Sequence, residues 1–267
     1  MQILEKAYRL FLVDLDGVVW RGKEIIEENV EWLRKAHDSG IKIVFVTNNS
    51  TRSRRLYMER LSAVMGWDVG PDEIITSGYA VAARLVDMCG RARVLVIGEE
   101  GLIEELVEQG HLVYTSMDPG SCLVDYVVVG LDRLVSYHKL WRAHQAIRKC
   151  GVPLIATNTD NVVPVEGGDA PGAGAILAFL ERSTGARPVF VAGKPETYMF
   201  ELALKLHGVH AVEALVIGDR CDTDIEAAKR AGMDSVLVLT GVAGERGELC
   251  DATYTVRSLA ELQFQKP

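Results

Sequence analysis

Short apolar runs alternate with amphipathic stretches along the chain. The run IKIVFVT at 41–47 is rich in β-branched residues, which is typical of a buried strand. The stretch EENVEWLRKAHDSG at 27–40 places apolar residues at helical spacing and ends at a glycine, a suitable C-terminal cap. This alternation predicts a mainly parallel sheet that helices cover on both faces.

The same alternation returns in the last third of the chain. Strand patterns occur at 188–196, 213–224 and 234–241, and helical patterns occur between them at 197–208 and 225–232. We expect these strands to join the strands near the start of the chain in one sheet.

The middle of the chain carries a second block of strands and helices. The stretches 92–114 and 125–160 each have the pattern strand, helix, strand, and 171–185 adds a closing helix. The block is neither rich in Pro and Ser nor low in complexity, so we interpret it as a folded insertion rather than a linker.

The predicted fold class is therefore α/β, with a Rossmann-like parallel-sheet core and an inserted α/β domain. We expect the core to comprise residues 1–78 and 187–267. The inserted domain is expected to comprise residues 79–186.

Composition places the chain among ordinary globular proteins. Of its 267 residues, 48% are hydrophobic and 25% are charged, enough to build a sizeable core. The formal net charge of −8 argues against a nucleic-acid partner, which requires a basic surface. It does not exclude a small anionic substrate, because a local cation can override the overall charge.

Cysteine usage and apolar run lengths bear on the compartment. The five cysteines include no C-x-x-C pair, and their number is odd, so we expect free thiols in a reducing compartment. Charges interrupt the N-terminal stretch MQILEKAYRL, which lacks the layout of a signal peptide, and no apolar run is long enough for a membrane span. We therefore expect a cytoplasmic protein without a membrane partner.

Polar side chains follow several of the predicted strands. Open α/β sheets bind their ligands at the carboxyl ends of the strands, so these side chains are expected to converge. They are Asp14, Asp16, Thr47, Asn48, Asn49, Lys194, Asp219, Asp222 and Asp224.

Several carboxylates in one small site repel one another unless a cation binds there. Mg²⁺ prefers carboxylates together with water and phosphate oxygens, and Asp14 and Asp219 are its natural direct ligands. The backbone carbonyl of Asp16 is a third candidate ligand. Lys194 adds a fixed positive charge and Thr47 adds a hydrogen-bond donor, so the set suits a phosphoryl group.

A carboxylate can itself be the nucleophile in phosphate transfer and form an aspartyl-phosphate. The second acid would then protonate the leaving oxygen and later activate water. This role requires Asp16 to be protonated at the start. We therefore expect burial and the neighbouring charge of Asp14 to raise the pKa of Asp16.

Four motifs resemble those of the haloacid dehalogenase superfamily and occur in the same order. They are DLDGVVW, TNNS, GKP and GDRCDTD. The insertion after the second motif, with ATNTD and PGAGA inside it, resembles the NagD-like branch. That branch has a type IIA cap and includes 4-nitrophenyl phosphatases and phosphatases of small phosphorylated metabolites.

The resemblance implies a role for each matching residue. Asp14 would be the nucleophile, Asp16 the acid and base, and Lys194 the group that holds nucleophile and phosphate together. Asp219 would complete the Mg²⁺ shell, with Asp224 behind the direct ligands. The transferring phosphate would lie on Thr47, Asn48 and Asn49. A small phosphorylated metabolite is the implied partner, and a homodimer is one candidate assembly, since related caps often mediate dimers.

One departure from the family pattern bears on the substrate. A histidine precedes the matching cap proline in pyridoxal-phosphate phosphatases of this branch, but Val163 stands here before Pro164, which argues against pyridoxal phosphate.

Two questions stay open. Asn158 and Asp160 form either an ordinary turn or part of a cap surface over the site. The function could also be that of a receiver-type phospho-acceptor module or of a phosphotransferase in the same superfamily.

Overall fold

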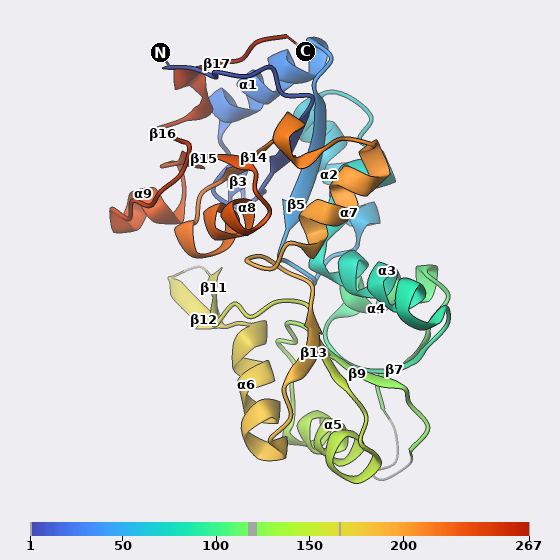
Figure 1. The fold of residues 1–267 in the computed structure, drawn as a ribbon. Helices are drawn as coiled ribbons and strands as arrows, with labels where there is room; N and C mark the ends of the chain where they lie inside the picture. Colours follow the sequence, from blue (N-terminus) through green and yellow to red (C-terminus); the bar gives the residue numbers. More distant parts are fainter. Residues whose placement is uncertain (1, 117–121, 166, 267) are drawn as a thin grey trace. The chain divides into compact units, whose positions relative to one another are not determined.

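A computed structural model describes residues 2–116, 122–165 and 167–266 (Figure 1). The chain folds as two compact units. Unit 1 comprises Met1–Thr47, Arg55–Ile75 and Lys194–Pro267, and unit 2 comprises Asn48–Arg54 and Thr76–Gly193. The chain therefore passes between the units several times.

In the described part of unit 1, six strands form one sheet in the order β16-β15-β14-β2-β5-β6. Its register aligns Val13 with both Ile217 and Phe45, and these pairings are parallel. The strands are β2 (Leu10–Val13), β5 (Lys42–Thr47), β6 (Ile74–Thr76), β14 (Ala214–Gly218), β15 (Asp234–Val238) and β16 (Tyr254–Val256). The predicted α/β class is confirmed.

Helices and short strands complete unit 1. The helices are α1 (Glu27–Asp38), α2 (Arg54–Met65), α7 (Tyr198–His207), α8 (Glu226–Arg230) and α9 (Val242–Arg246). The short strands are β1 (Gln2–Ile3), β3 (Trp20–Arg21), β4 (Glu24–Ile25) and β17 (Leu262–Gln263), in which β3 pairs with β4 and β1 pairs with β17.

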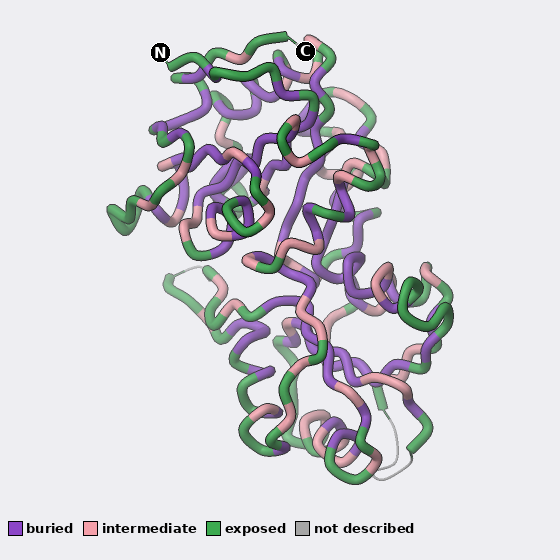
Figure 2. The backbone as a smooth tube through the Cα atoms, in the orientation of Figure 1, coloured by how far each residue is buried: buried purple, intermediate pink, exposed green. Residues whose placement is uncertain are grey.

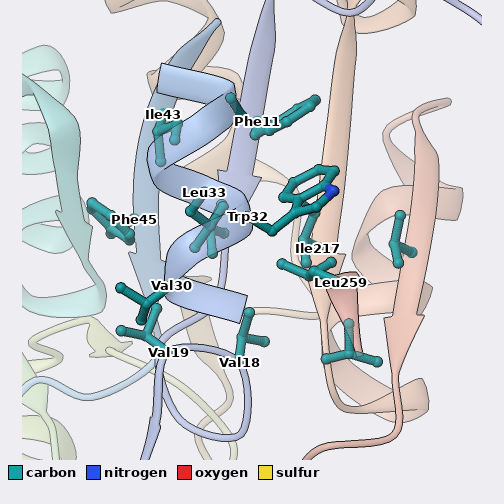
Figure 3. Packing of buried hydrophobic residues seen from close by; sticks show 14 of the residues in the cluster. Phe11, Val18, Val19, Val30, Trp32, Leu33, Ile43, Phe45, Ile217 and Leu259 are labelled. Carbon is teal, nitrogen blue, oxygen red and sulfur yellow. The ribbon is translucent and has the colours of Figure 1, made fainter. Parts of the chain in front are cut away.

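The core of unit 1 forms where α1 packs against the sheet (Figure 3). Trp32 of α1 stacks on Phe11 of β2 with ring centroids 5.3 Å apart, and both side chains are buried. The strands of this sheet are buried along nearly their whole length (Figure 2). This packing fixes the strands whose ends carry the candidate site.

Unit 2 has its own sheet and its own core. In its described residues, five strands form a parallel sheet in the order β13-β10-β9-β7-β8. They are β7 (Arg93–Ile97), β8 (Leu112–Tyr114), β9 (Tyr126–Val129), β10 (Leu154–Ala156) and β13 (Pro188–Val191). The helices are α3 (Ser77–Cys89), α4 (Glu100–Glu108), α5 (Tyr137–Cys150) and α6 (Ala173–Thr184), and β11 (Val162–Val165) pairs with β12 (Gly168–Pro171).

One strand lies in a different sheet from the one that we expected. The pattern at 188–196 predicts a strand of the core sheet, but β13 pairs with β10 at the edge of the unit 2 sheet. Local pattern identifies a strand, whereas its partner is decided by tertiary contacts. The side chains of β13 are half-buried or exposed, as is usual for an edge.

The expectation of free thiols is wrong for four of the five cysteines. Cys122 is bonded to Cys150 and Cys221 to Cys250, at sequence separations of 28 and 29. Cys89 alone is a free, exposed thiol. The odd count and the absence of C-x-x-C could not reveal these pairs, because the fold brings distant cysteines together. Among the described residues, no helix has both the length and the apolar character that crossing a membrane requires.

Candidate active site

The parallel register of unit 1 gathers three candidate residues at one edge of its sheet. Asp14 directly follows β2, Thr47 ends β5, and Asp219 directly follows β14. Because β2 lies between β5 and β14, the carboxyl ends of these strands are neighbours. This edge is where open α/β sheets bind ligands.

Lys194 lies at the centre of the group. Its Nζ donates to Asp14 Oδ1 at 2.5 Å, to Asp224 Oδ1 at 2.6 Å and to the carbonyl of Val46 at 3.0 Å. Burial lowers the pKa of Lys194, but Asp14 and Asp224 more than compensate, and its pKa is raised. The lysine is therefore a permanent cation, although it is only 3% exposed.

Asp14, Asp219 and Asp224 form a cluster in which one oxygen of each lies within 4.8 Å of the others. Burial raises the pKa of Asp14 well above its usual range, despite the ammonium group of Lys194. Burial and the charge of Asp224 raise the pKa of Asp219 to about 7. Three carboxylates against one ammonium group leave two uncompensated negative charges when all are ionised.

Two glycines allow the backbone to approach Asp219 closely. A Cβ on Gly17 would lie 2.3 Å from Asp219 Oδ2, and one on Gly241 would lie 2.1 Å from the same oxygen. Gly17 also has a φ of +82°, which favours glycine. The backbone N–H of Val242 donates to Asp219 Oδ2 at 2.7 Å. The carboxylate is thus held in one orientation.

Asp224 is engaged on both of its oxygens. Oδ1 accepts from Lys194, and Oδ2 accepts from the backbone N–H of Arg220 at 3.2 Å. Asp224 is 2% exposed and lies in the π-helical turn Cys221–Ile225 that follows β14. It therefore orients the lysine as well as belonging to the acidic cluster.

The expected burial of Asp16 is wrong. Its side chain is exposed, and its Oδ1 accepts from Trp20 Nε1 at 3.1 Å. Asp16 comes three residues after the end of β2, where the chain has left the sheet, so it does not share the burial of Asp14.

Thr47 and the two asparagines divide between the units. Thr47 is 2% exposed in unit 1, whereas Asn48 and Asn49 belong to unit 2. Asn49 Oδ1 accepts from both the N–H and the hydroxyl of Thr51, at 2.9 and 2.7 Å. This arrangement is a local turn just before α2.

Asn158 and Asp160 both contact Asn48. Asn158 Nδ2 donates to the carbonyl of Asn48 at 2.8 Å, and Asn48 Nδ2 donates to Asp160 Oδ2 at 3.0 Å. Asn158 Oδ1 accepts from the N–H of Asp160 at 3.1 Å, which forms a turn. Asn158 and Asp160 are thus joined by a hydrogen bond within one turn, and this turn has a partner, Asn48, that the sequence did not suggest.

Thr240 and Gly241 are site residues that the sequence argument missed. Thr240 Oγ1 donates to the carbonyl of Gly17 at 2.6 Å, and the backbone of Gly241 lies close against the carboxylate of Asp219. Both follow β15 at its carboxyl end, so the rule that found the other strand ends could have found them.

The donor set fits a hard divalent cation. Oxygen-rich clusters with excess negative charge bind Mg²⁺ well, and this cluster offers buried carboxylates with fixed orientations. The single lysine compensates only part of the charge. A metal ion is the remaining means of keeping all three carboxylates ionised in a buried site.

Comparison with known proteins gives a consistent result. Residues 11–111 match a family of haloacid dehalogenase-like hydrolases, and residues 191–262 match a second HAD-like hydrolase family. The chain is similar to the 5'-nucleotidase YutF of Bacillus subtilis (strain 168), with 38% identity over 262 residues, covering 96% of this chain and 98% of that protein.

Other relatives have similar coverage. The acid sugar phosphatase of Staphylococcus aureus (strain MRSA252) is 37% identical over 259 residues, which covers 96% of this chain and 97% of that protein. Among solved structures, a p-nitrophenyl phosphatase from Archaeoglobus fulgidus matches with a TM-score of 0.87 and 37% identity, covering 96% of this chain and 98% of that one.

Proposed function

Because this chain belongs to the haloacid dehalogenase-like hydrolases and is a phosphoric monoester hydrolase, we propose that it cleaves small phosphate monoesters through an aspartyl-phosphate on Asp14. The observation that carries the proposal is the short contact of Lys194 with Asp14 beside the buried acidic cluster. This contact holds a carboxylate oxygen in place at the sheet edge where ligands bind.

The catalytic cycle has two displacements at phosphorus. An oxygen of Asp14 attacks the phosphorus, the bond to the leaving oxygen breaks, and Asp16 gives that oxygen a proton. Asp16 then takes a proton from water as the water attacks the aspartyl-phosphate. Inorganic phosphate leaves and Asp14 is restored. The exposure of Asp16 suits a group that exchanges protons with solvent between turnovers.

Asp14, Asp219 and the backbone carbonyl of Asp16 are the proposed ligands of Mg²⁺. Asp224, which belongs to the same cluster, is proposed to act as the partner of Lys194 rather than as a direct ligand. A bound Mg²⁺ would supply positive charge for the phosphate oxygens. Thr47, Asn48 and Asn49 are proposed to line the phosphate position. Lys194 favours the ionised form of Asp14 and holds its carboxylate in position.

We further propose that residues 1–78 and 187–267 act as the catalytic core, except for residues 48–54, 76–78 and 187–193, which belong to unit 2. We propose that the insertion acts as the cap that selects the leaving group. The names of the relatives favour nucleoside 5'-phosphates and sugar phosphates as well as 4-nitrophenyl phosphate. A screen of phosphorylated metabolites with Mg²⁺, measured by phosphate release, ranks these classes.

Removal of the nucleophile tests the proposal. Asp14→Asn should lower kcat by about four orders of magnitude or more, because an amide cannot form the aspartyl-phosphate. The variant keeps the size of the side chain, so circular dichroism should show an unchanged fold. Turnover within about tenfold of the unmodified protein would overturn covalent catalysis by Asp14.

The receiver-type alternative is not proposed, because the relatives that match 96% of this chain are named as a nucleotidase and as phosphatases. A phosphotransferase remains distinguishable by product. If an added alcohol took the phosphoryl group in preference to water, new phosphate esters would form in place of inorganic phosphate.

A further inference from the structure

The turn Thr157–Asp160 follows β10 and contacts the segment in which the phosphate is proposed to bind. We propose that Asn158 and Asp160 are positioning residues that act through Asn48 and set the geometry of the phosphate-binding segment 47–49. The inference rests on the proposed function, since it assigns a role within that site.

Asn48 is held on both its backbone and its side chain. Its carbonyl oxygen accepts from Ser77 Oγ at 2.6 Å and from Asn158 Nδ2 at 2.8 Å. Its Nδ2 donates to Asp160 Oδ2 at 3.0 Å. Three hydrogen bonds therefore fix the peptide plane that follows Asn48 and the direction of its amide.

The residues that hold Asn48 are themselves well fixed. Asn158 is 5% exposed and Ser77 is fully buried. Asn158 Oδ1 accepts from the N–H of Asp160, so the two side chains belong to one turn. A buried polar group with satisfied hydrogen bonds is costly to displace, which makes this turn a rigid support.

Two glycines at the start of α6 pack closely against the backbone of the turn Thr157–Asp160. A Cβ on Gly172 would lie 2.2 Å from the carbonyl oxygen of Asp160, and one on Gly174 would lie 2.3 Å from that of Thr159. The N–H of Gly174 donates to the Asp160 carbonyl at 2.9 Å. These contacts give a structural reason for the two glycines of the PGAGA stretch, to which the proposed catalytic cycle assigns no role.

Gly193, the residue before Lys194, packs against Asn48 and Asn158. A Cβ on Gly193 would lie 2.7 Å from Asn158 Cβ and from Asn48 Oδ1. Its N–H donates to the carbonyl of Thr157 at 2.7 Å. The turn thus supports the residue that follows Thr47 and the residue that precedes the catalytic lysine.

The chemical consequence is preorganisation. The fixed peptide plane joins Asn48 to Asn49, so it sets the direction of the Asn49 N–H and the path of the chain next to Thr47. Donors with a fixed direction bind a phosphate more tightly than donors that must first be ordered. On this account the side chain of Asn48 acts as a support, and its amide donates to Asp160.

Asp160→Ala separates positioning from electrostatics. The substitution removes a negative charge, which by Coulomb's law alone should strengthen binding of an anion. Loss of the Asn48 contact should instead raise KM for 4-nitrophenyl phosphate and Ki for inorganic phosphate about tenfold. Asp160→Asn removes the same charge but keeps an acceptor oxygen, so it should stay within about twofold of the unmodified protein.

Thr159→Ala is the matched control, because it changes an exposed side chain in the same turn. The melting temperature of each variant is measured beside Ki. If Asp160→Ala does not fold, Ser77→Ala replaces it, since it deletes another hydrogen bond to Asn48. Unchanged or tighter phosphate binding in the folded variant would overturn the inference. Absence of phosphatase activity in the unmodified protein would instead overturn the proposed function.

Discussion

At the scale of single residues, Asp16 shows how exposure bears on its proposed role. Asp16→Ala should lower kcat for alkyl phosphates about a hundredfold or more, because their leaving oxygen needs a proton. The loss should be much smaller for 4-nitrophenyl phosphate, whose leaving group is a stable anion. Steady-state kinetics on both substrates measure the ratio. Equal losses would contradict an acid role for Asp16.

Gly241 tests the packing around Asp219. Gly241→Ala would place a methyl group 2.1 Å from Asp219 Oδ2, and relief of this overlap costs about 1–3 kcal/mol. Since the carboxylate must move, affinity for Mg²⁺ should fall about 10- to 100-fold. Titration of activity with Mg²⁺ measures the change. Gly70→Ala is the control, because its Cβ would make only an ordinary contact of 3.7 Å.

Lys194 contacts Asp14, but it follows β13 of the unit 2 sheet, so the rule for neighbouring strands does not account for its place in the site. The convergence of Asp14 and Asp219 was predicted correctly because it depends on a general property of parallel sheets. Neighbouring strands place their carboxyl ends together whatever their detailed packing. The exposure of Asp16 and the hold on Asn48 by Asp160 depend on where loops run after they leave the sheet. Periodicity along the sequence carries no such information.

At the scale of elements, the bond between Cys221 and Cys250 ties the acidic loop to the segment after α9. With a sequence separation of 29 between the cysteines, removal of the bond should cost about 3.5 kcal/mol by the chain-entropy argument. Cys221→Ser with Cys250→Ser should also weaken Mg²⁺ binding, because the loop carries Asp219 and Asp224. Denaturant unfolding and Mg²⁺ titration measure the two effects.

The second disulfide supplies the comparison. Cys122 and Cys150 lie in unit 2 and include no proposed metal ligand. Their replacement by serine should lower stability while leaving the Mg²⁺ affinity unchanged. An equal loss of affinity in both double variants would contradict a specific role for the Cys221 bond.

Strand β13 shows what the sequence pattern cannot predict at this scale, which is the sheet that a strand joins. Its apolar run identified it as a strand, and that part was correct. Nothing local distinguishes an edge position beside β10 from one in the six-stranded sheet, since both are parallel and follow a helix. The choice depends on which partner the rest of the fold leaves available.

At the scale of the whole molecule, the two units have separate apolar cores. The acidic cluster belongs entirely to unit 1. Mg²⁺ at a hundred times its Kd should stabilise that unit by about 2.7 kcal/mol. Hydrogen exchange should therefore slow about a hundredfold for the most protected amides of β2 and β14, and change little in β9 and β10.

Asp219→Asn is the control for this experiment, because it removes one carboxylate of the cluster without changing its size. It should abolish the difference that Mg²⁺ makes. Equal slowing in both units would show that they unfold together, in contradiction to the prediction.

The assignment of Asn48–Arg54 to unit 2 has a consequence for engineering. A chimera that exchanged only the long insertion with that of a relative would pair a foreign TNTD turn with the native Asn48. A hybrid enzyme that is to acquire a new leaving-group preference and keep its affinity for phosphate must therefore receive residues 48–54 and 76–193 together.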